Sequence, residues 1–450
     1  MIKDQISAFN DSLIAHREFV SLIDPFLNKR KEEFDKNIQP IVFCSLIDKL
    51  LSSNKEWKEG EKEEILGIKS NLEKNANKDY LENLTVDLVK KDGEGDDSES
   101  EILIKVGSND ILTREKLESA ERAENHIDLL YTNSLISVLS SVEWYFSQLL
   151  HFYYEKYPDS SGVNKRTLTL TELKAFGSVQ DAEKYLVDLK IEEILRGSFD
   201  SWVNLLSDEF KLGLNYLNDI KTDLIEIYQR RNLLVHNGGI VNSIYLSKVK
   251  DSQRQNIKLG CKVLVDKAYL DYAMNNLEKG FILIGAELWK KISLEDQDRA
   301  FILNEIVYDK LLESKWDVAR SLSLFVIKDT KCDPIDKVVA QLNYWLCEKE
   351  MDRFDHVKKE VEEANYSDKN LLLQLGLYAL KIDVVNFFKT LEMALDSDQF
   401  TIELLEEFPI MKEIRKTDEY AEFKKNSGYF VLETDSEDVK VDITLDSEMI

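Results

Sequence analysis

The sequence predicts a mainly α-helical protein with more than one domain. Of its 450 residues 43% are hydrophobic, while only 5 are proline and 16 are glycine. Apolar residues recur at helical spacing along most of the chain, most regularly beyond residue 294. Since 450 residues exceed what one hydrophobic core usually holds, we expect two or three folded domains. We place them at residues 1–120, 121–293 and 294–426, and we assign residues 427–450 to an acidic tail.

The N-terminal region is expected to contain helices at residues 3–26, 39–53 and 61–74. Two strand-like segments, residues 84–89 and 101–106, flank a stretch with six acidic residues and two glycines, which predicts a small β-hairpin insertion. No residue in this region points to chemistry. The region is either an elaboration packed on the central domain or a sensor for a trigger or partner.

The C-terminal region is expected to form a small α-solenoid of helical hairpins. Helical patterns occur in pairs, at residues 298–312 with 316–326, 334–347 with 354–364, and 371–380 with 384–395. Trp316, Phe354 and Val384 begin the second helices at separations close to the roughly 34 residues of a tetratricopeptide repeat, so the array resembles that family in architecture. Residues 408–423 would cap it. Such arrays bind a protein along one face, and support of dimerisation is the alternative.

The remaining composition excludes several classes of protein. No apolar run approaches the roughly 18 residues of a membrane span and no secretory signal is visible, so we expect a cytoplasmic protein. Cys44, Cys261, Cys332 and Cys347 lack metal-ligand spacing, and they predict neither disulfides nor zinc. Within the tail, alternating apolar residues at 439–445 predict an edge strand or a mobile acidic segment.

The residues with the clearest chemistry lie at the end of a predicted helix, residues 222–235. Arg231 carries a permanent positive charge, and His236 follows five positions later, just before a glycine pair that can end a helix. At the helix C-terminus the helix dipole favours the imidazolium form of His236. Five residues correspond to about 140° around a helix, so the two side chains do not converge unless a second copy completes the site. The alternative is that Arg231 pairs with a carboxylate and His236 caps its helix.

This stretch resembles the Arg-x4-His motif of HEPN-domain ribonucleases, in which a polar residue follows the arginine and His-Asn-Gly closes the helix. Asn232 and Asn237–Gly238 fit that pattern. Residues 135–157, which include Glu143, are similar to the first helix of the family's bundle. Further resemblance lies in residues 168–206 and 267–291. The expected fold is therefore a HEPN-like helical bundle at residues 121–293.

The resemblance implies metal-independent RNA cleavage by a homodimer that combines two such motifs, with no cofactor. Arg231 and His236 would be the catalytic residues, stabilising phosphorane charge and transferring a proton. Asn232, Arg230 and Glu143 would support them: Arg230 by a phosphate contact and Asn232 by orienting the imidazole or the phosphate. For Glu143, a solvated position on its helix is the alternative.

Charge is unevenly distributed along the chain. The net charge is −26, which opposes general affinity for RNA. Between residues 228 and 262, however, seven basic residues accompany one acidic residue. We assign Lys248, Lys250, Arg254 and Lys258 to RNA binding and Tyr245 to base stacking, with a core position as the alternative for Tyr245.

Two functions are compatible with the sequence. One is an RNA endonuclease, held inactive until needed as a toxin or antiviral defence effector. The other is a non-catalytic dimeric adaptor that recruits a protein partner through the helical array. The acidic composition favours the adaptor modestly.

Overall fold

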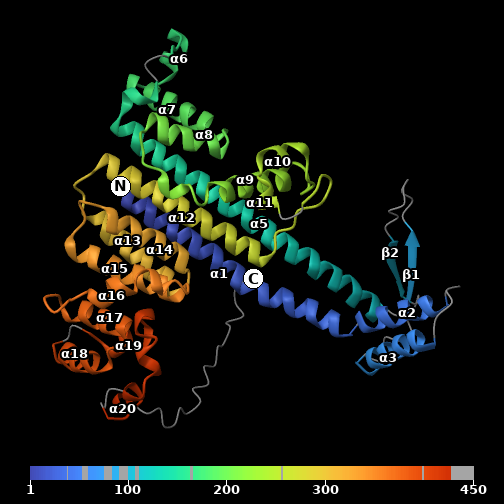
Figure 1. The fold of residues 1–450 in the computed structure, drawn as a ribbon. Coiled ribbons are helices and arrows are strands. Elements are labelled where there is room, and N and C mark those ends of the chain that lie inside the picture. Colours follow the sequence, from blue (N-terminus) through green and yellow to red (C-terminus); the bar gives the residue numbers. More distant parts are fainter. Residues whose placement is uncertain are drawn as a thin grey trace, which may run out of the picture. The chain divides into compact units, whose positions relative to one another are not determined.

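The computed structural model describes residues 1–37, 39–52, 59–75, 84–90, 100–106, 111–162, 166–254, 257–397 and 400–426. These residues are mainly helical, as predicted, and the chain divides into two compact units, Met1–Gly285 and Ala286–Ile450. Figure 1 shows the helices and strands of each unit. No helix within the described ranges is both long enough and apolar enough to cross a membrane.

Three long helices form the frame of the N-terminal unit: α1 (Ile2–Asn37), α5 (Ile111–Lys156) and the part of α12 (Lys267–Ile292) that lies before Ala286. They run alongside one another in Figure 1. Phe9 of α1 stacks on Tyr145 of α5 at 4.3 Å between ring centroids. A side chain at Gly285 would place its Cβ only 1.9 Å from the Tyr145 hydroxyl, so glycine is needed for this close approach.

The N-terminal residues therefore share a core with the predicted central domain. The expected boundary at residue 120 falls inside α5, which starts at Ile111 rather than 135, and α1 continues to Asn37 with Pro25 inside it. An ion pair between the partly exposed Arg17 and the buried Glu278, Nη2 to Oε2 at 2.7 Å, fastens α1 to α12. The N-terminal helix packs into this core because its apolar residues Ile6, Phe9 and Leu13 are fully buried there.

Smaller elements complete this unit. Helices α2 (Gln39–Ser52) and α3 (Glu59–Asn75) contact each other, and strand β1 (Leu84–Lys90) pairs antiparallel with β2 (Ser100–Val106), Leu84 opposite Val106. The connection between the strands, where the acidic loop is predicted, lies outside the described residues. The helices between α5 and α12 are α6 (Leu170–Ala175), α7 (Val179–Leu195), α8 (Phe199–Asn204), α9 (Lys221–His236), α10 (Ser243–Lys248) and α11 (Asp251–Arg254). A Ser, Thr or Asn side chain caps the N-terminus of α6, α7, α8 and α10.

The C-terminal unit consists of successive short helices. Its first helices are α13 (Asp298–Leu312), α14 (Trp316–Lys328) and α15 (Pro334–Glu350), and they contact one another in order. The predicted helix at 354–364 is instead a 3-10 turn, Phe354–His356, followed by α16 (Lys358–Glu363). The unit continues with α17 (Leu371–Lys381), α18 (Val384–Asp396), α19 (Ile402–Glu407) and α20 (Asp418–Asn426). The predicted tail at residues 427–450 lies outside the described part of the chain.

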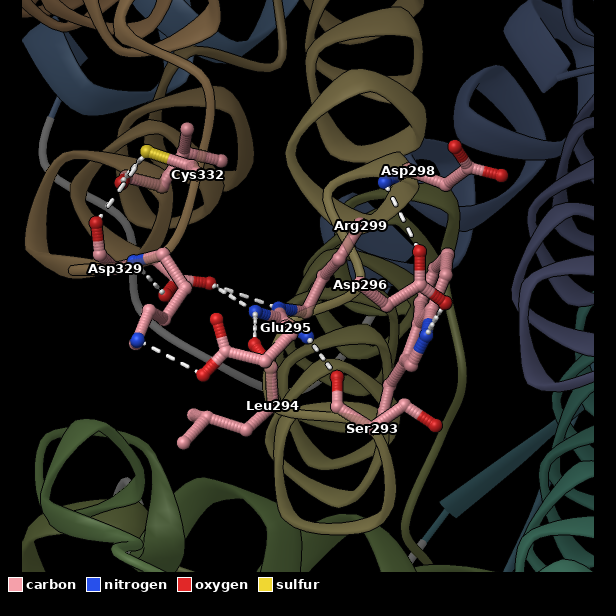
Figure 2. Close-up of polar contacts among 11 residues, drawn as sticks. Ser293, Leu294, Glu295, Asp296, Asp298, Arg299, Asp329 and Cys332 are labelled. Carbon is pink, nitrogen blue, oxygen red and sulfur yellow. Dashed lines mark hydrogen bonds and ion pairs between the residues drawn. The ribbon is translucent and has the colours of Figure 1, made fainter.

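A polar cluster fixes the start of this unit, as Figure 2 shows. Arg299 of α13 is 1% exposed, and its Nε and Nη2 donate to Asp329 Oδ2 at 2.8 and 2.6 Å. Its other donors reach the carbonyl oxygens of Ser293 and Leu294 at 3.2 and 3.3 Å. The guanidinium thus joins the connection before α13 to the end of α14, with both charges removed from solvent.

The pH dependence of stability is expected to report on His16 in α1. Its Nε2 lies 3.1 Å from Ser141 Oγ of α5, and burial lowers the imidazole pKa. Below the ordinary histidine pKa of about 6.5, the unfolded chain therefore binds more protons than the folded chain. The free energy of unfolding consequently falls as the pH is lowered below that value. Urea unfolding of His16→Gln should show a shallower loss between about pH 7 and pH 5. Equal pH slopes for both proteins would contradict this assignment.

Candidate active site

The end of α9 places His236 at the surface. The buried face of α9 contains Leu224, Ile227, Tyr228 and Leu233. The backbone amides of Asn237 and Gly239 both donate to the Leu233 carbonyl, at 2.8 and 3.0 Å, and Gly238 and Gly239 have φ of 60° and 79°. These left-handed residues end the helix immediately after His236. The imidazole is consequently exposed.

Arg231 is held by a carboxylate from the neighbouring helix. Its Nη2 lies 3.2 Å from Glu143 Oε1 of α5, and its Nη1 lies 3.4 Å from Asn232 Oδ1. Both charged side chains stay partly accessible, at 23% for Arg231 and 29% for Glu143. Burial raises the pKa of the Glu143 carboxyl, and the Arg231 charge opposes that shift. Glu143, Arg231 and Asn232 therefore form one cluster, and the carboxylate partner of Arg231 is the one that the alternative, structural reading of this arginine expects.

Unused polar atoms remain around this cluster. The buried Nε of Arg231 and the hydroxyl of Tyr228 have no hydrogen-bond partner within the described chain. Burial, together with the Glu143 charge, raises the pKa of Tyr228 well above its ordinary value, so this phenol stays protonated. Tyr228 was not predicted as a site residue, because its spacing on α9 identifies it only as part of the apolar face.

Arg231 and His236 are not joined to each other by a hydrogen bond within the described chain. This agrees with their angular separation on a helix. Two large apolar side chains next to these residues in the sequence are exposed. Trp144, which follows Glu143, is 52% exposed, and Val235, which precedes His236, is 46% exposed.

Arg230 has a structural position, which corrects the expected phosphate contact. Only 8% of the residue is exposed. Its Nε donates to Glu226 Oε1 at 2.8 Å, its Nη1 donates to the Leu264 carbonyl at 2.7 Å, and its guanidinium lies 3.9 Å from the centroid of the Tyr269 ring. These contacts leave little of the guanidinium for a ligand. The four-residue spacing of Glu226 and Arg230 is a sequence signal for this pair, whereas Tyr269 carries none.

Tyr245 belongs to the same buried network, so the base-stacking prediction is wrong. The residue is 1% exposed, which leaves no ring face for a nucleobase. Its hydroxyl donates to Glu226 Oε1 at 2.8 Å, and Tyr269 donates to Glu226 Oε2 at 2.5 Å. The ring packs with Leu233, Val241, Val249 and Val263 in a small core beside α9.

Arg254 is also occupied by the fold. Its Nε donates to the Val249 carbonyl at 2.8 Å, its Nη2 donates to the Leu246 carbonyl, and its Nη1 lies 2.7 Å from Asp251 Oδ1. It satisfies carbonyls at the end of α10, which corrects its assignment to RNA binding. By contrast, Lys248, Lys250 and Lys258 are exposed, together with Lys262.

The Tyr245 hydroxyl is expected to stabilise the fold around α9. Removing it in Tyr245→Phe leaves the ring packing intact but deletes a hydrogen bond to a buried carboxylate. The expected loss in the free energy of unfolding is about 1.5–3 kcal/mol. Chemical denaturation measures it, with the exposed Tyr185→Phe as control, for which we expect no measurable change. Equal stability of the two variants would exclude an energetic role for this bond.

Two further findings concern metal ligands and similarity to known proteins. Among the described residues, no group of three or more His, Cys, Asp and Glu side chains is arranged to hold a metal ion. Comparisons with protein-family models, curated proteins and solved structures find no match to this chain.

Proposed function

We propose that this chain is a metal-independent RNA endonuclease. The observation that carries the proposal is the end of α9. There Arg231, oriented by Glu143 and still partly accessible, precedes by five residues a surface imidazole at a helix terminus. The resemblance of this stretch to the Arg-x4-His motif of HEPN ribonucleases supports phosphodiester cleavage as the reaction.

The proposed reaction begins with attack by a ribose 2′-hydroxyl on the adjacent phosphorus. The 2′-oxygen forms a bond to phosphorus as its proton leaves, and the bond to the 5′-oxygen breaks as that oxygen gains a proton. The products are a 2′,3′-cyclic phosphate and a 5′-hydroxyl. His236 transfers a proton at one of these oxygens, and Arg231 stabilises the charge that develops on the phosphorane.

The active enzyme is proposed to be a homodimer with two such motifs in one composite site. The angular separation of Arg231 and His236 supports this, because one helix does not direct both side chains to one phosphate. Trp144 and Val235 offer exposed apolar surface beside the same residues in sequence. Lys248, Lys250 and Lys258 would guide the RNA strand, and Asn232 would orient the Arg231 guanidinium.

Such an enzyme requires restraint, because unrestricted RNA cleavage harms the cell that makes it. We therefore infer a regulated toxin or antiviral defence effector that acts in the cytoplasm. The helical array beyond residue 294 would bind the regulating protein.

A second function, a non-catalytic dimeric adaptor, is favoured by one observation. Arg231 has an intramolecular carboxylate partner, the arrangement expected of a structural ion pair. The exposure of His236 leaves its imidazole accessible to a substrate, as the nuclease proposal requires.

Incubation of the full chain with total RNA, with and without EDTA, tests the proposal. We expect cleavage that EDTA leaves unchanged, and fragments ending in a cyclic phosphate, which block ligation until the ends are repaired. Cleavage that EDTA abolishes would contradict a metal-independent mechanism. Intact RNA with a stable dimer that binds a protein partner would favour the adaptor.

A further inference from the structure

The C-terminal unit contains a cavity that takes no part in the proposed cleavage. Its volume is about 560 Å³, within the range of roughly 300–1,000 Å³ typical of sites for small molecules. Helices α13, α15 and α17 and the segment 404–411 contribute its walls. Most of the lining is apolar and includes Phe301, Tyr308, Leu342, Leu346, Leu372 and Phe408.

One buried polar atom in the lining lacks a partner. Asn304 is 8% exposed, and its Nδ2 donates to the backbone carbonyl of Asp336 at 2.9 Å. This bond fixes the orientation of the amide, since only the nitrogen can donate. The Oδ1 atom is then left buried without a hydrogen bond from any described residue. A buried acceptor of this kind requires a donor, and the described chain does not supply one.

The charges of the lining have a single sign. Glu305, Asp309 and Asp336 contribute to the cavity wall, and none of the described residues lining it is Lys, Arg or His. A ligand with positive charge therefore gains from the local electrostatic potential, and an anion is repelled. An ammonium group also supplies the hydrogen-bond donors that Asn304 Oδ1 lacks.

We propose that this cavity binds a small organic amine with an apolar, preferably aromatic, body. The ammonium group donates to Asn304 Oδ1 and lies near the carboxylates of Glu305 and Asp309. The body packs against the apolar wall that Tyr308 and Phe408 share, whose rings contact each other edge to face at 5.2 Å. The volume lies in the range of small-molecule sites, which favours a small ligand over a segment of a protein.

Three probes with one body and different head groups test the proposal on the full chain: 4-phenylbutylamine, 4-phenylbutan-1-ol and 4-phenylbutyrate. Ligand-observed NMR titrations measure their affinities at neutral pH. We expect the amine to bind about tenfold more tightly than the alcohol, because one charge-assisted hydrogen bond contributes about that factor in affinity. The carboxylate should bind more weakly than either.

Variants locate the binding. Val339→Trp places a large side chain in the cavity from a partly exposed position on α15, and it should abolish binding of both the amine and the alcohol. Glu305→Gln with Asp309→Asn replaces two carboxylates of the lining by amides of similar size, and it should remove the preference for the amine while the alcohol still binds. Glu392→Gln on α18, an exposed acid away from the lining, is the matched control and should behave as wild type.

Equal affinity for all three probes would overturn the proposal, since it would indicate unspecific apolar contact. Binding that persists in Val339→Trp would overturn it as well. The double carboxylate variant keeps the test decisive if Val339→Trp fails to fold. None of these outcomes depends on RNA cleavage, so the cavity and the active site are tested separately.

Discussion

Arg231→Ala is expected to lower the rate of RNA cleavage by about 10²–10³-fold, the usual effect of removing one group that stabilises transition-state charge. His236→Ala should lower it by about 10²–10⁴-fold, as for a general acid or base. Initial rates on a short RNA under single-turnover conditions measure both effects. The two side chains act on one phosphate, so the double variant should lose less than the product of the single effects.

Matched controls separate catalysis from folding. Arg196→Ala removes an exposed arginine that also has an intramolecular carboxylate partner, and His356→Ala removes an exposed histidine; neither should change the rate. Circular dichroism and dimer mass should be unchanged in the active-site variants. Full activity in Arg231→Ala or His236→Ala would exclude these residues from the chemistry.

Asp329→Ala is expected to cost more stability than any other proposed substitution that removes an ion pair or a hydrogen bond. The substitution leaves the guanidinium of Arg299, a residue that is 1% exposed, buried without its carboxylate partner. Breaking a buried ion pair in this way costs about 3–5 kcal/mol of the free energy of unfolding. Urea denaturation of the C-terminal unit within the full chain measures the loss. The effect arises from the unpaired charge, so Arg299→Met combined with Asp329→Leu should recover much of it.

The neighbouring ion pair is the control for this prediction. Lys331 Nζ lies 2.8 Å from Glu295 Oε1, but these side chains are 41% and 74% exposed. Glu295→Ala should therefore cost less than about 1 kcal/mol. Similar losses for Asp329→Ala and Glu295→Ala would show that burial does not determine the energy of the pair.

The C-terminal helices are predicted well because their information is local. Helices α13, α14, α15, α17 and α18 begin at the residues expected from apolar periodicity and end at most three residues from them. There are two exceptions. After Phe354 a 3-10 turn replaces the first turn of the expected helix. Instead of the helix pair expected to cap the array at residues 408–423, two 3-10 turns lie between α19, which ends at Glu407, and α20, which begins at Asp418. In the N-terminal unit the same signal misses the start of α5, since its first turns show no clear apolar face.

The candidate site is predicted only in part, because neighbouring residues on a helix point in different directions. Arg230 and Arg231 are adjacent in sequence, yet about 100° of rotation carries one into a buried network and leaves the other at the surface. Glu143 is a candidate from the sequence only as a supporting residue, and its pairing with Arg231 is not predicted, because the packing of α5 against α9 is not encoded locally. The partner of Arg230 that comes from α12, Tyr269, is set by tertiary packing alone.

The internal partners of the arginines limit how RNA binding can depend on salt. Of the seven basic residues between 228 and 262, Arg230, Arg231 and Arg254 each have a carboxylate within the chain, which leaves four lysines. In the proposed nuclease, a single strand that contacts these lysines of one chain would displace about four counterions beyond the scissile phosphate. The logarithm of affinity should fall with the logarithm of salt concentration with a slope of about −3 or shallower. Because phosphate contacts do not read the sequence of a strand, the selectivity of the proposed nuclease among RNAs would have to come from its other contacts with the bound strand.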